Sequence, residues 1–207
     1  MELILITKNY PYGNGEEFLE DEIKRLSEKF VRIHLLCLST DKILTRITPE
    51  NVFVTRIDNK NIENKVFSAL KIISLKTFKE FDYVKNNLKL KIDKNIIKKI
   101  LSYYYYEKEL LRKFMNLSVK DTILCSCGLG PGAYAVGNFK FPCFEKIAVL
   151  NEKDVIDENY IPFSKEIYKN LDKILFLEEG IKDNYIKGIK DKDILDIAKC
   201  DLFVLEK

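Results

Sequence analysis

The sequence predicts an α/β fold in which a Rossmann-like parallel sheet is flanked by helices. Three observations point to it: short apolar runs typical of buried strands, helical spacing of apolar residues between them, and alternation of the two along the chain. Strand, helix and strand in that order form a right-handed βαβ unit with parallel strands. Because 207 residues suit one generous domain, we expect a single domain over residues 1–207.

The first βαβ unit lies in the amino-terminal quarter. Residues 2–7 (ELILIT) predict a buried strand, and the runs 31–39 and 52–57 predict two more. Apolar residues recur at helical spacing from Glu16 to Phe30, which predicts a helix. Its first residues, Glu16 and Glu17, would complement the positive end of the helix dipole, and they would disfavour a phosphate there.

A helical, basic insertion is expected around residues 61–117. Its later part has an apolar stripe flanked by lysines, formed by Ile92, Ile96, Ile97, Ile100, Leu101 and Tyr104 beside Lys91, Lys94, Lys98 and Lys99. Two interpretations stay open: a solvated helix that packs by this stripe, or a face that contacts anionic lipid headgroups or a phosphorylated substrate. The four tyrosines 103–106 point in four directions on a helix, so we expect most of them to be buried or half-buried.

The α/β alternation resumes after the insertion. Strands are predicted at 122–128, 146–152 and 173–178, helices at 130–138, from Pro162 and at 180–189, and the tail 193–207 offers a final strand. About six strands result. Because the carboxyl ends of parallel strands share one edge of a sheet, residues 13–15, 128–130 and 151–154 should meet in one crevice.

Composition excludes several classes of function. A net charge of +3 with 32% charged residues is too balanced for a nucleic-acid binder. Five irregularly spaced cysteines, no CxxC pair and one histidine, His34, predict reduced thiols and no metal site, although Cys125 and Cys127 face the same side of a strand. There is no signal-like leader and no apolar run of ~18 residues, so a soluble cytoplasmic protein is expected.

Two glycine clusters follow strands. The second, CGLGPGA, has the form G-x-G-x-x-A with Gly128, Gly130 and Ala133, and Glu152 stands where a ribose-binding acid would. A dinucleotide-binding oxidoreductase domain is therefore a distant alternative, and a glycine-rich turn for close helix–sheet packing is the simpler one. The first cluster, YPYGNGEEF, has neither the dinucleotide spacing nor the lysine of a P-loop.

The first cluster also carries a resemblance. The stretch YPYGNGEEFLEDEIKRLSEKF resembles the amino-terminal signature of family-4 retaining glycosyltransferases of the GT-B fold, and YIPFSKEIYKNLDKILFLEEGIKDNYIKG resembles a later segment of that family. The resemblance implies one half of a GT-B fold, the acceptor-side domain, with the carboxy-terminal donor-binding domain absent. It also implies transfer of a sugar from a nucleotide-sugar to a glycan or lipid-linked acceptor, with polysaccharide biosynthesis as the expected process, and without metal or other cofactor.

The resemblance also implies a set of site residues. The substrate-binding set is Gly13, Asn14, Gly15, Glu16, Glu17, Gly128, Gly130 and Tyr134. The family's His-Gly-x-Asp motif corresponds to residues 151–154, where Asp154 matches and Asn151 replaces the histidine. Because asparagine does not titrate, an acid/base role at this position is lost, and no catalytic residue is assigned. The family's Ser-Glu pair appears as Glu178 and Glu179.

Two classes of function remain open on this basis. One is an incomplete transferase, weakly active or inactive alone, whose donor domain is a separate chain. The other is a non-catalytic binding module or relic of the family. If Tyr10 and Tyr12 are exposed, they form an apolar lip that would meet a donor-domain chain or a second copy of this chain. Peripheral contact with the inner face of the membrane is a further expectation, and contact with nucleic acid is not expected.

Overall fold

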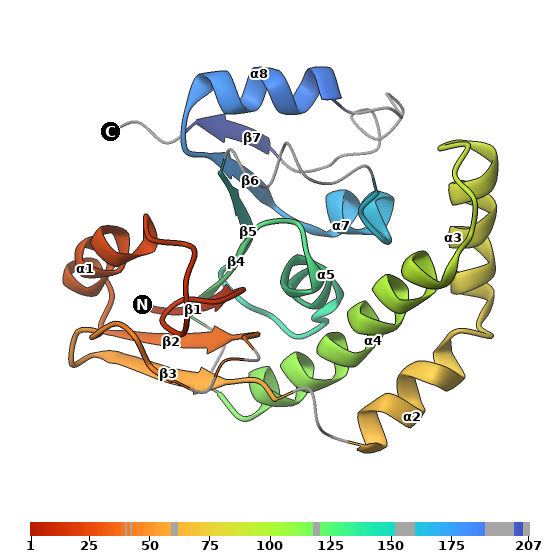
Figure 1. The fold of residues 1–207 in the computed structure, drawn as a ribbon. Helices are drawn as coiled ribbons and strands as arrows, with labels where there is room; N and C mark the ends of the chain where they lie inside the picture. The colour runs from red at the N-terminus through yellow and green to blue at the C-terminus, as the bar shows by residue number, and fades with distance from the viewer. Residues whose placement is uncertain are drawn as a thin grey trace.

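The structure is a computed structural model that describes residues 1–39, 41, 43–58, 62–117, 121–151, 160–188 and 201–204. Seven strands form one sheet in the order β3-β2-β1-β4-β5-β6-β7, and every neighbouring pair is parallel (Figure 1). The strands are β1 (Glu2–Thr7), β2 (Arg32–Cys37), β3 (Val52–Arg56), β4 (Thr122–Cys127), β5 (Glu145–Leu150), β6 (Lys173–Phe176) and β7 (Asp201–Val204). The predicted α/β class is confirmed, and the tail contributes the last strand.

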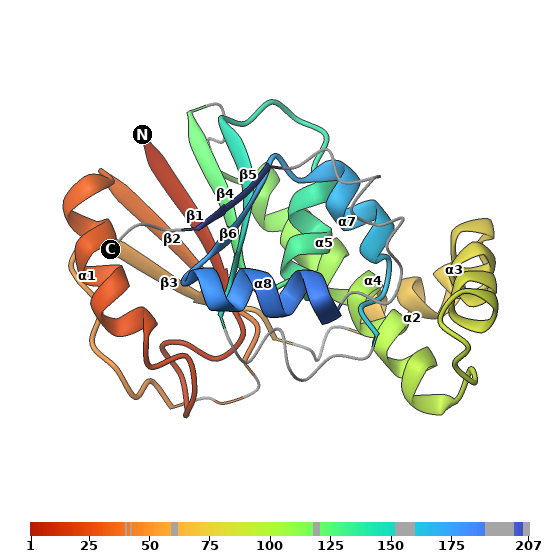
Figure 2. The same cartoon turned by 90° about the horizontal axis from the view of Figure 1, so that it is seen from above.

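Helices connect the strands. They are α1 (Leu19–Lys29), α2 (Ile62–Lys71), α3 (Leu75–Asn86), α4 (Lys94–Met115), α5 (Pro131–Asn138), α7 (Ser164–Asn170) and α8 (Glu179–Gly188). The insertion expected around 61–117 consists of α2, α3 and α4, and it lies between β3 and β4. Figure 2 shows α2 and α3 at the far side of α4 from the sheet.

The alternation of side chains along each strand builds two cores. On one face Leu3 and Leu5 of β1 pack with Ile23 of α1. On the other face Ile4 and Ile6 of β1 belong to a larger core with α4, α5 and α7. Both faces of the central strands are covered, which is why these strands read as continuous apolar runs.

The chain reverses its direction of travel across the sheet beside β1. From β1 it goes outward through β2 and β3, and after the helical insertion it returns to β4 on the other side of β1. The carboxyl ends of β1 and β4 therefore lie side by side while their connections diverge. Open α/β sheets bind ligands at such a topological switch point.

The four consecutive tyrosines of α4 tie that helix to four segments. Tyr103, Tyr104 and Tyr105 are buried and Tyr106 is half-buried, as the sequence predicts. Their hydroxyls are hydrogen-bonded in turn to the Leu129 carbonyl (3.3 Å), the Thr77 hydroxyl (2.8 Å), the Asp58 carbonyl (2.7 Å) and the Leu38 carbonyl (3.4 Å). The apolar stripe of α4 therefore faces the core, with Ile100 and Tyr104 fully buried.

The single histidine and the buried thiols lie in ordinary structural surroundings. His34 of β2 contacts β1, with its Nε2 3.4 Å from the Glu2 carboxylate. Burial raises the pKa of the Cys125 thiol to about 12, so this cysteine stays protonated. Among the described residues, no helix is both long enough and apolar enough to cross a bilayer.

Candidate functional site

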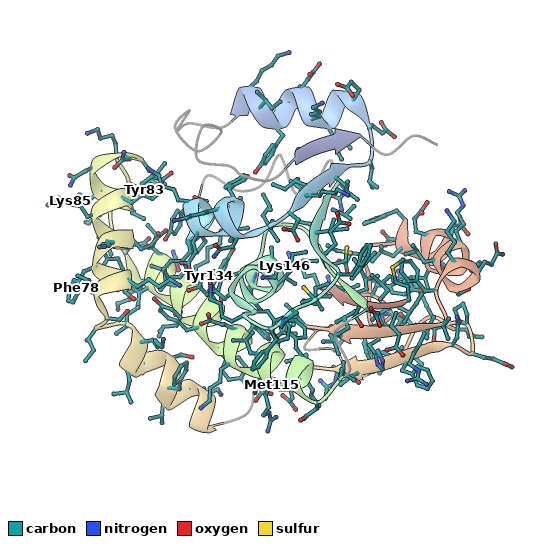
Figure 3. The ribbon with its side chains drawn as sticks, turned by 180° about the vertical axis from the view of Figure 1, so that it is seen from behind. Phe78, Tyr83, Lys85, Met115, Tyr134 and Lys146 are labelled. Carbon is teal, nitrogen blue, oxygen red and sulfur yellow. The ribbon has the colours of Figure 1, made fainter. Side chains whose placement is uncertain are left out.

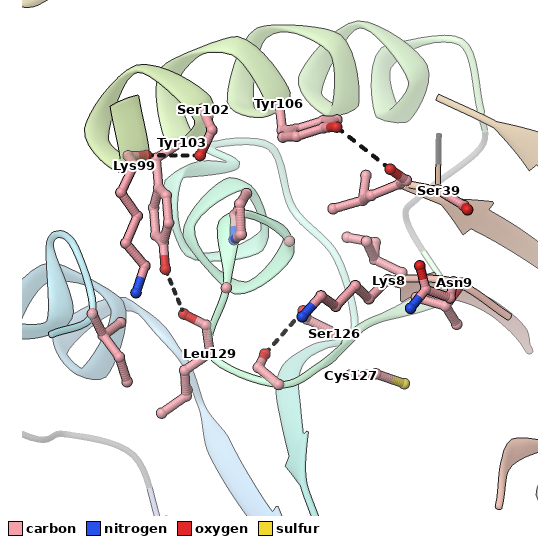
Figure 4. Close-up of a pocket in the computed structure, with 18 residues that line it drawn as sticks. Lys8, Asn9, Ser39, Lys99, Ser102, Tyr103, Tyr106, Ser126, Cys127 and Leu129 are labelled. Atoms are coloured by element: carbon pink, nitrogen blue, oxygen red, sulfur yellow. Dashed lines mark hydrogen bonds between the residues drawn. The ribbon is translucent and has the colours of Figure 1, made fainter. Parts of the chain in front are cut away.

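A cavity of about 470 Å³ lies at the switch point between β1 and β4 (Figure 4). Its floor is formed by the carboxyl ends of β1 and β4 and by Leu38 and Ser39, which follow β2. The turn from Gly128 to Gly132 forms one wall, and Lys99, Ser102, Tyr103 and Tyr106 of α4 form another. The size suits a monosaccharide or a comparable small molecule.

The lining has a positive charge balance. Among the described residues that line it are two lysines, Lys8 and Lys99, and no aspartate or glutamate. The Lys99 ammonium donates to the Tyr160 carbonyl at 2.7 Å, which holds it at the rim beside α7. Hydroxyls of Ser102, Ser126 and Tyr106 add groups that hydrogen-bond a polar ligand. The cavity therefore suits a small hydroxylated ligand that carries a negative charge.

The second glycine cluster forms a fixed wall of this cavity. Gly128 has φ +84°, a conformation that favours glycine, and its N–H donates to the Val149 carbonyl at 2.7 Å. The Ser126 hydroxyl donates to the Gly128 carbonyl at 3.1 Å. These contacts fix the turn before α5, whose amino end opens beside the cavity. Anions are favoured near a helix amino end.

Gly132 explains why this cluster is rich in glycine. A Cβ at this position would lie 2.6 Å from the Ser126 Oγ and 2.8 Å from the Ile6 Cγ2. The glycine therefore allows α5 to pack closely on β1 and β4, which is the simpler of the two interpretations of the CGLGPGA motif.

The first glycine loop is built differently from the sequence expectation. Helix α1 begins at Leu19, not at Glu16, because Gly13, Gly15 and Glu16 all have left-handed φ values, from +53° to +99°. The Glu16 carboxylate instead turns back and accepts backbone N–H groups of Lys8 (3.1 Å), Asn9 (2.6 Å) and Tyr10 (2.8 Å). The interpretation of Glu16 and Glu17 as opening the helix is therefore wrong. Glu16 supports the segment that leads into the cavity at Asn9.

The connection from β2 to β3 holds the outer part of this loop. The Thr45 hydroxyl donates to the carbonyls of Pro11 (3.0 Å) and Gly13 (2.9 Å), and the Arg46 guanidinium donates to the Gly15 carbonyl (3.0 Å). Glu17 accepts the Gly15 N–H at 2.9 Å and lies 3.7 Å from Arg46. The lining of the cavity contains none of residues 13–17. Their role in ligand binding, and that of the exposed Asn14, stays a prediction.

Other expected site residues lie in different surroundings. Gly128 and Gly130 line the cavity, whereas the Tyr134 side chain is 1% exposed and stacks on Phe163, with ring centroids 4.8 Å apart. Tyr134 is therefore part of the core and not of the cavity. Asn151 follows β5 at the same sheet edge and is half-buried. Asp154 and Glu152 lie outside the described residues.

The expected aromatic lip does not form. Tyr10 is 1% exposed and its ring lies under the Arg46 guanidinium, 5.5 Å from the ring centroid, while Tyr12 is half-buried. Sequence reasoning also missed residues that do line the cavity, among them Lys8, Asn9, Ser39, Ser102, Tyr106 and Ser126. For Lys8 and Asn9 a signal was available, because they directly follow a strand that the sequence predicts to be buried, at the carboxyl edge of the sheet.

Comparisons with known proteins give different relatives by sequence and by fold. No protein-family model matches the chain. In sequence it is 25–26% identical to D-alanine–D-alanine ligases from three strains of Helicobacter pylori. The matches cover the whole chain but only 60% of each ligase, so the chain spans about three fifths of the curated relatives.

A solved structure resembles the chain in fold. It is an Escherichia coli trehalose-6-phosphate synthase of the GT-B fold, bound with UDP-2-fluoro glucose. The TM-score is 0.51 at 11% sequence identity, and the match covers 91% of this chain and 42% of that one. At this identity the likeness concerns fold alone. The fold is thus an α/β, Rossmann-like domain that matches one half of a GT-B fold.

Proposed function

We propose that the chain is the acceptor-side domain of a family-4-like glycosyltransferase, which moves a sugar from a nucleotide-sugar to a glycan or lipid-linked acceptor. The observation that carries the proposal is the cavity at the β1–β4 switch point, at the edge of a GT-B-like half-domain. Of the two motifs that resemble the family, the later one contributes Ile161 to the lining and Tyr160, whose carbonyl holds Lys99. The earlier one follows β1 and contributes no lining residue.

The charge of the cavity limits which class of acceptor it can bind. Two lysines and the amino end of α5 face this space, and none of the lining residues in the described part of the chain is acidic. An acceptor with a phosphate or carboxylate next to sugar hydroxyls fits this balance better than a neutral sugar. Lys8 and Lys99 are the proposed anion contacts, and Asn9, Ser102 and Ser126 are the proposed hydroxyl contacts.

The chemistry assigned to this domain is positioning. Asn151 stands where the resembled family has a histidine, and an amide donates a hydrogen bond but transfers no proton near neutral pH. The proposal therefore includes a donor-binding domain that supplies the contacts to the leaving phosphate, on this or another polypeptide. The alternative within the same fold is a binding module that holds the glycan without chemistry.

Calorimetric titration tests the proposal. The ligands are phosphorylated monosaccharides, the same sugars without phosphate, and UDP- and GDP-sugars. We expect the phosphorylated sugars to bind and nucleotide-sugars to bind weakly. Removing one charged contact costs about 1.4 kcal/mol, so Lys8→Ala should weaken binding about tenfold. Lys140→Ala, an exposed lysine outside the cavity, is the matched control.

The outcomes separate the candidates. Tight nucleotide-sugar binding that does not respond to Lys8→Ala would contradict the acceptor-side assignment. Transfer or hydrolysis of the donor sugar would favour the enzyme over the binding module.

The similarity to D-alanine–D-alanine ligases gives a second candidate, since it extends over the whole chain. D-alanine is therefore included in the titration. Heat with D-alanine and none with any sugar would favour a ligase-like domain.

A further inference from the structure

Five large apolar side chains are exposed together on α2, α3 and the turn between them. Their exposed fractions are 55% for Val66, 64% for Leu70, 69% for Ile73, 71% for Leu75 and 57% for Phe78. We call these five residues the outer apolar face. Val66 and Leu70 are four residues apart in α2, and Leu75 and Phe78 are three residues apart in α3, so each pair occupies one side of its helix, while Ile73 lies in the turn between the helices.

The inner side of α3 is fixed by hydrogen bonds, so Leu75 and Phe78 on its opposite side point outward. Thr77 hydrogen-bonds Tyr104 of α4 at 2.8 Å. The Glu80 carboxylate accepts the Tyr160 hydroxyl at 2.8 Å and the Phe163 N–H at 2.9 Å. Figure 3 shows Phe78 and Lys85 projecting from α3 away from the body of the protein, while Tyr83 points toward it.

The part of the chain that carries this face is rich in lysine, although α2 and α3 themselves, residues 62–86, hold five lysines and three acidic residues, an excess of two positive charges. Residues 62–99 contain ten lysines and four acidic residues, an excess of six positive charges, although the whole chain has a net charge of only +3. The rest of the chain is therefore net negative. Lys65, Lys79 and Lys85 are exposed on α2 and α3 themselves. Apolar side chains with lysines beside them are typical of segments that lie on an anionic membrane.

A second cavity lies between α2 and α4. It has a volume of about 300 Å³ and is lined by Lys65, Ala69, Leu101 and Tyr105. It shares Ser102 and Tyr106 with the cavity at the switch point, and none of the five residues of the outer apolar face lines it.

We propose that the outer apolar face docks the protein on a bilayer that contains anionic lipid, with Leu70, Ile73 and Phe78 inserted among the headgroups and the lysines on lipid phosphates. A membrane explains the observations better than a protein partner does, because Lys65, Lys79 and Lys85 are exposed on the same two helices as the apolar side chains. The docking stands apart from the proposed glycosyltransferase function. We favour it over the interpretation of the α4 stripe as a lipid-contacting face, because Ile100 and Tyr104 of that stripe are buried and its other four members are half-buried.

Co-sedimentation of the whole chain with vesicles tests the docking. The vesicles are phosphatidylcholine alone or with 30–40% phosphatidylglycerol, roughly the charge density at which lysine contacts matter. We expect at least tenfold stronger binding to the anionic vesicles and a loss of binding at high salt. Leu70→Ser with Phe78→Ser should reduce binding at least tenfold, and Lys79→Glu about fivefold or more.

The control is Ile47→Ser with Phe144→Ser. These residues are 92% and 65% exposed and lie outside α2 and α3, so this variant should bind like the parent. Circular dichroism of each variant checks that the helices are retained.

Equal binding to neutral and anionic vesicles, or an equal loss in the control, would overturn the proposal. Self-association by light scattering that Leu70→Ser with Phe78→Ser abolishes, without vesicle binding by the parent, would show a protein interface instead. Neither result bears on the sugar titration with Lys8→Ala.

Discussion

Replacing Glu16 by alanine is the most direct test of how the first glycine loop is held. The carboxylate accepts three consecutive backbone N–H groups, and those of Asn9 and Tyr10 are short and partly buried. Alanine leaves these donors without an acceptor. The loop then loses the contact that holds Asn9 at the edge of the cavity.

The magnitude follows from the geometry. A hydrogen bond to a charged group contributes about 1.5–3 kcal/mol, so the two short bonds account for roughly 3–6 kcal/mol. Because Glu16 is only half-buried, water replaces part of this, and we expect a loss of about 2–4 kcal/mol. The longer bond to Lys8 is solvent-exposed and is not counted. Glu16→Gln keeps one acceptor oxygen and should lose about half as much.

Urea unfolding followed by circular dichroism measures the loss as a lower midpoint at an unchanged slope. The control is Glu17→Ala. Glu17 is exposed, accepts one N–H and lies 3.7 Å from Arg46, so its removal should cost about 1 kcal/mol or less. A Glu16→Ala loss no larger than that of Glu17→Ala would refute the reasoning, because the carboxylate would then not be holding the loop.

Two further predictions concern packing and pH. Gly132→Ala should lower the free energy of unfolding by about 1 kcal/mol net, because overpacking costs about 1–3 kcal/mol and the better helix propensity of alanine returns about 1 kcal/mol. The control is Gly180→Ala, which has no atom within 4 Å of the new Cβ and should raise the free energy of unfolding by up to about 1 kcal/mol. Equal effects of the two substitutions in urea unfolding would contradict this prediction. Burial raises the pKa of Glu80, so its protonation stabilises the folded state at low pH and this contribution is lost as pH rises through the folded pKa. In thermal melts, the stability of the parent relative to Glu80→Gln should therefore increase from pH 8 to pH 5. A difference that stays constant over this range would argue against a buried Glu80 carboxyl with a raised pKa.

Much of the fold follows from local pattern. The runs 2–7 and 122–128 are mostly apolar, and such a run is enough to predict a strand that is covered on both faces. The strands 146–152 and 173–178 are found in the same way. The alternation with helices then leaves a parallel sheet as the consistent topology. The order of the strands in the sheet, and with it the switch point and the place of the cavity, comes from the structure.

The candidate site was less accessible to the same reasoning. The glycines of the second cluster could be assigned to a turn, and Gly128 and Gly130 do line the cavity. The polar residues of α4 could not, because Ser102 and Tyr106 are 16 or more positions away from both strands whose ends they face. Their place depends on the angle at which α4 crosses the sheet.

The sequence by itself determined the strands, the helices and their order along the chain, because the spacing of apolar residues shows which side of a strand or helix is buried. Only the tertiary structure decided what Glu16 binds and which apolar faces are covered. Glu16 turns back on the segment before it because three backbone N–H groups converge there. The stripes of α2, α3 and α4 all have helical spacing, but a stripe does not say which neighbour will cover it. The stripe of α4 meets the core, and the outer apolar face on α2 and α3 meets none, because their other sides are held by Tyr104, Tyr160 and Phe163.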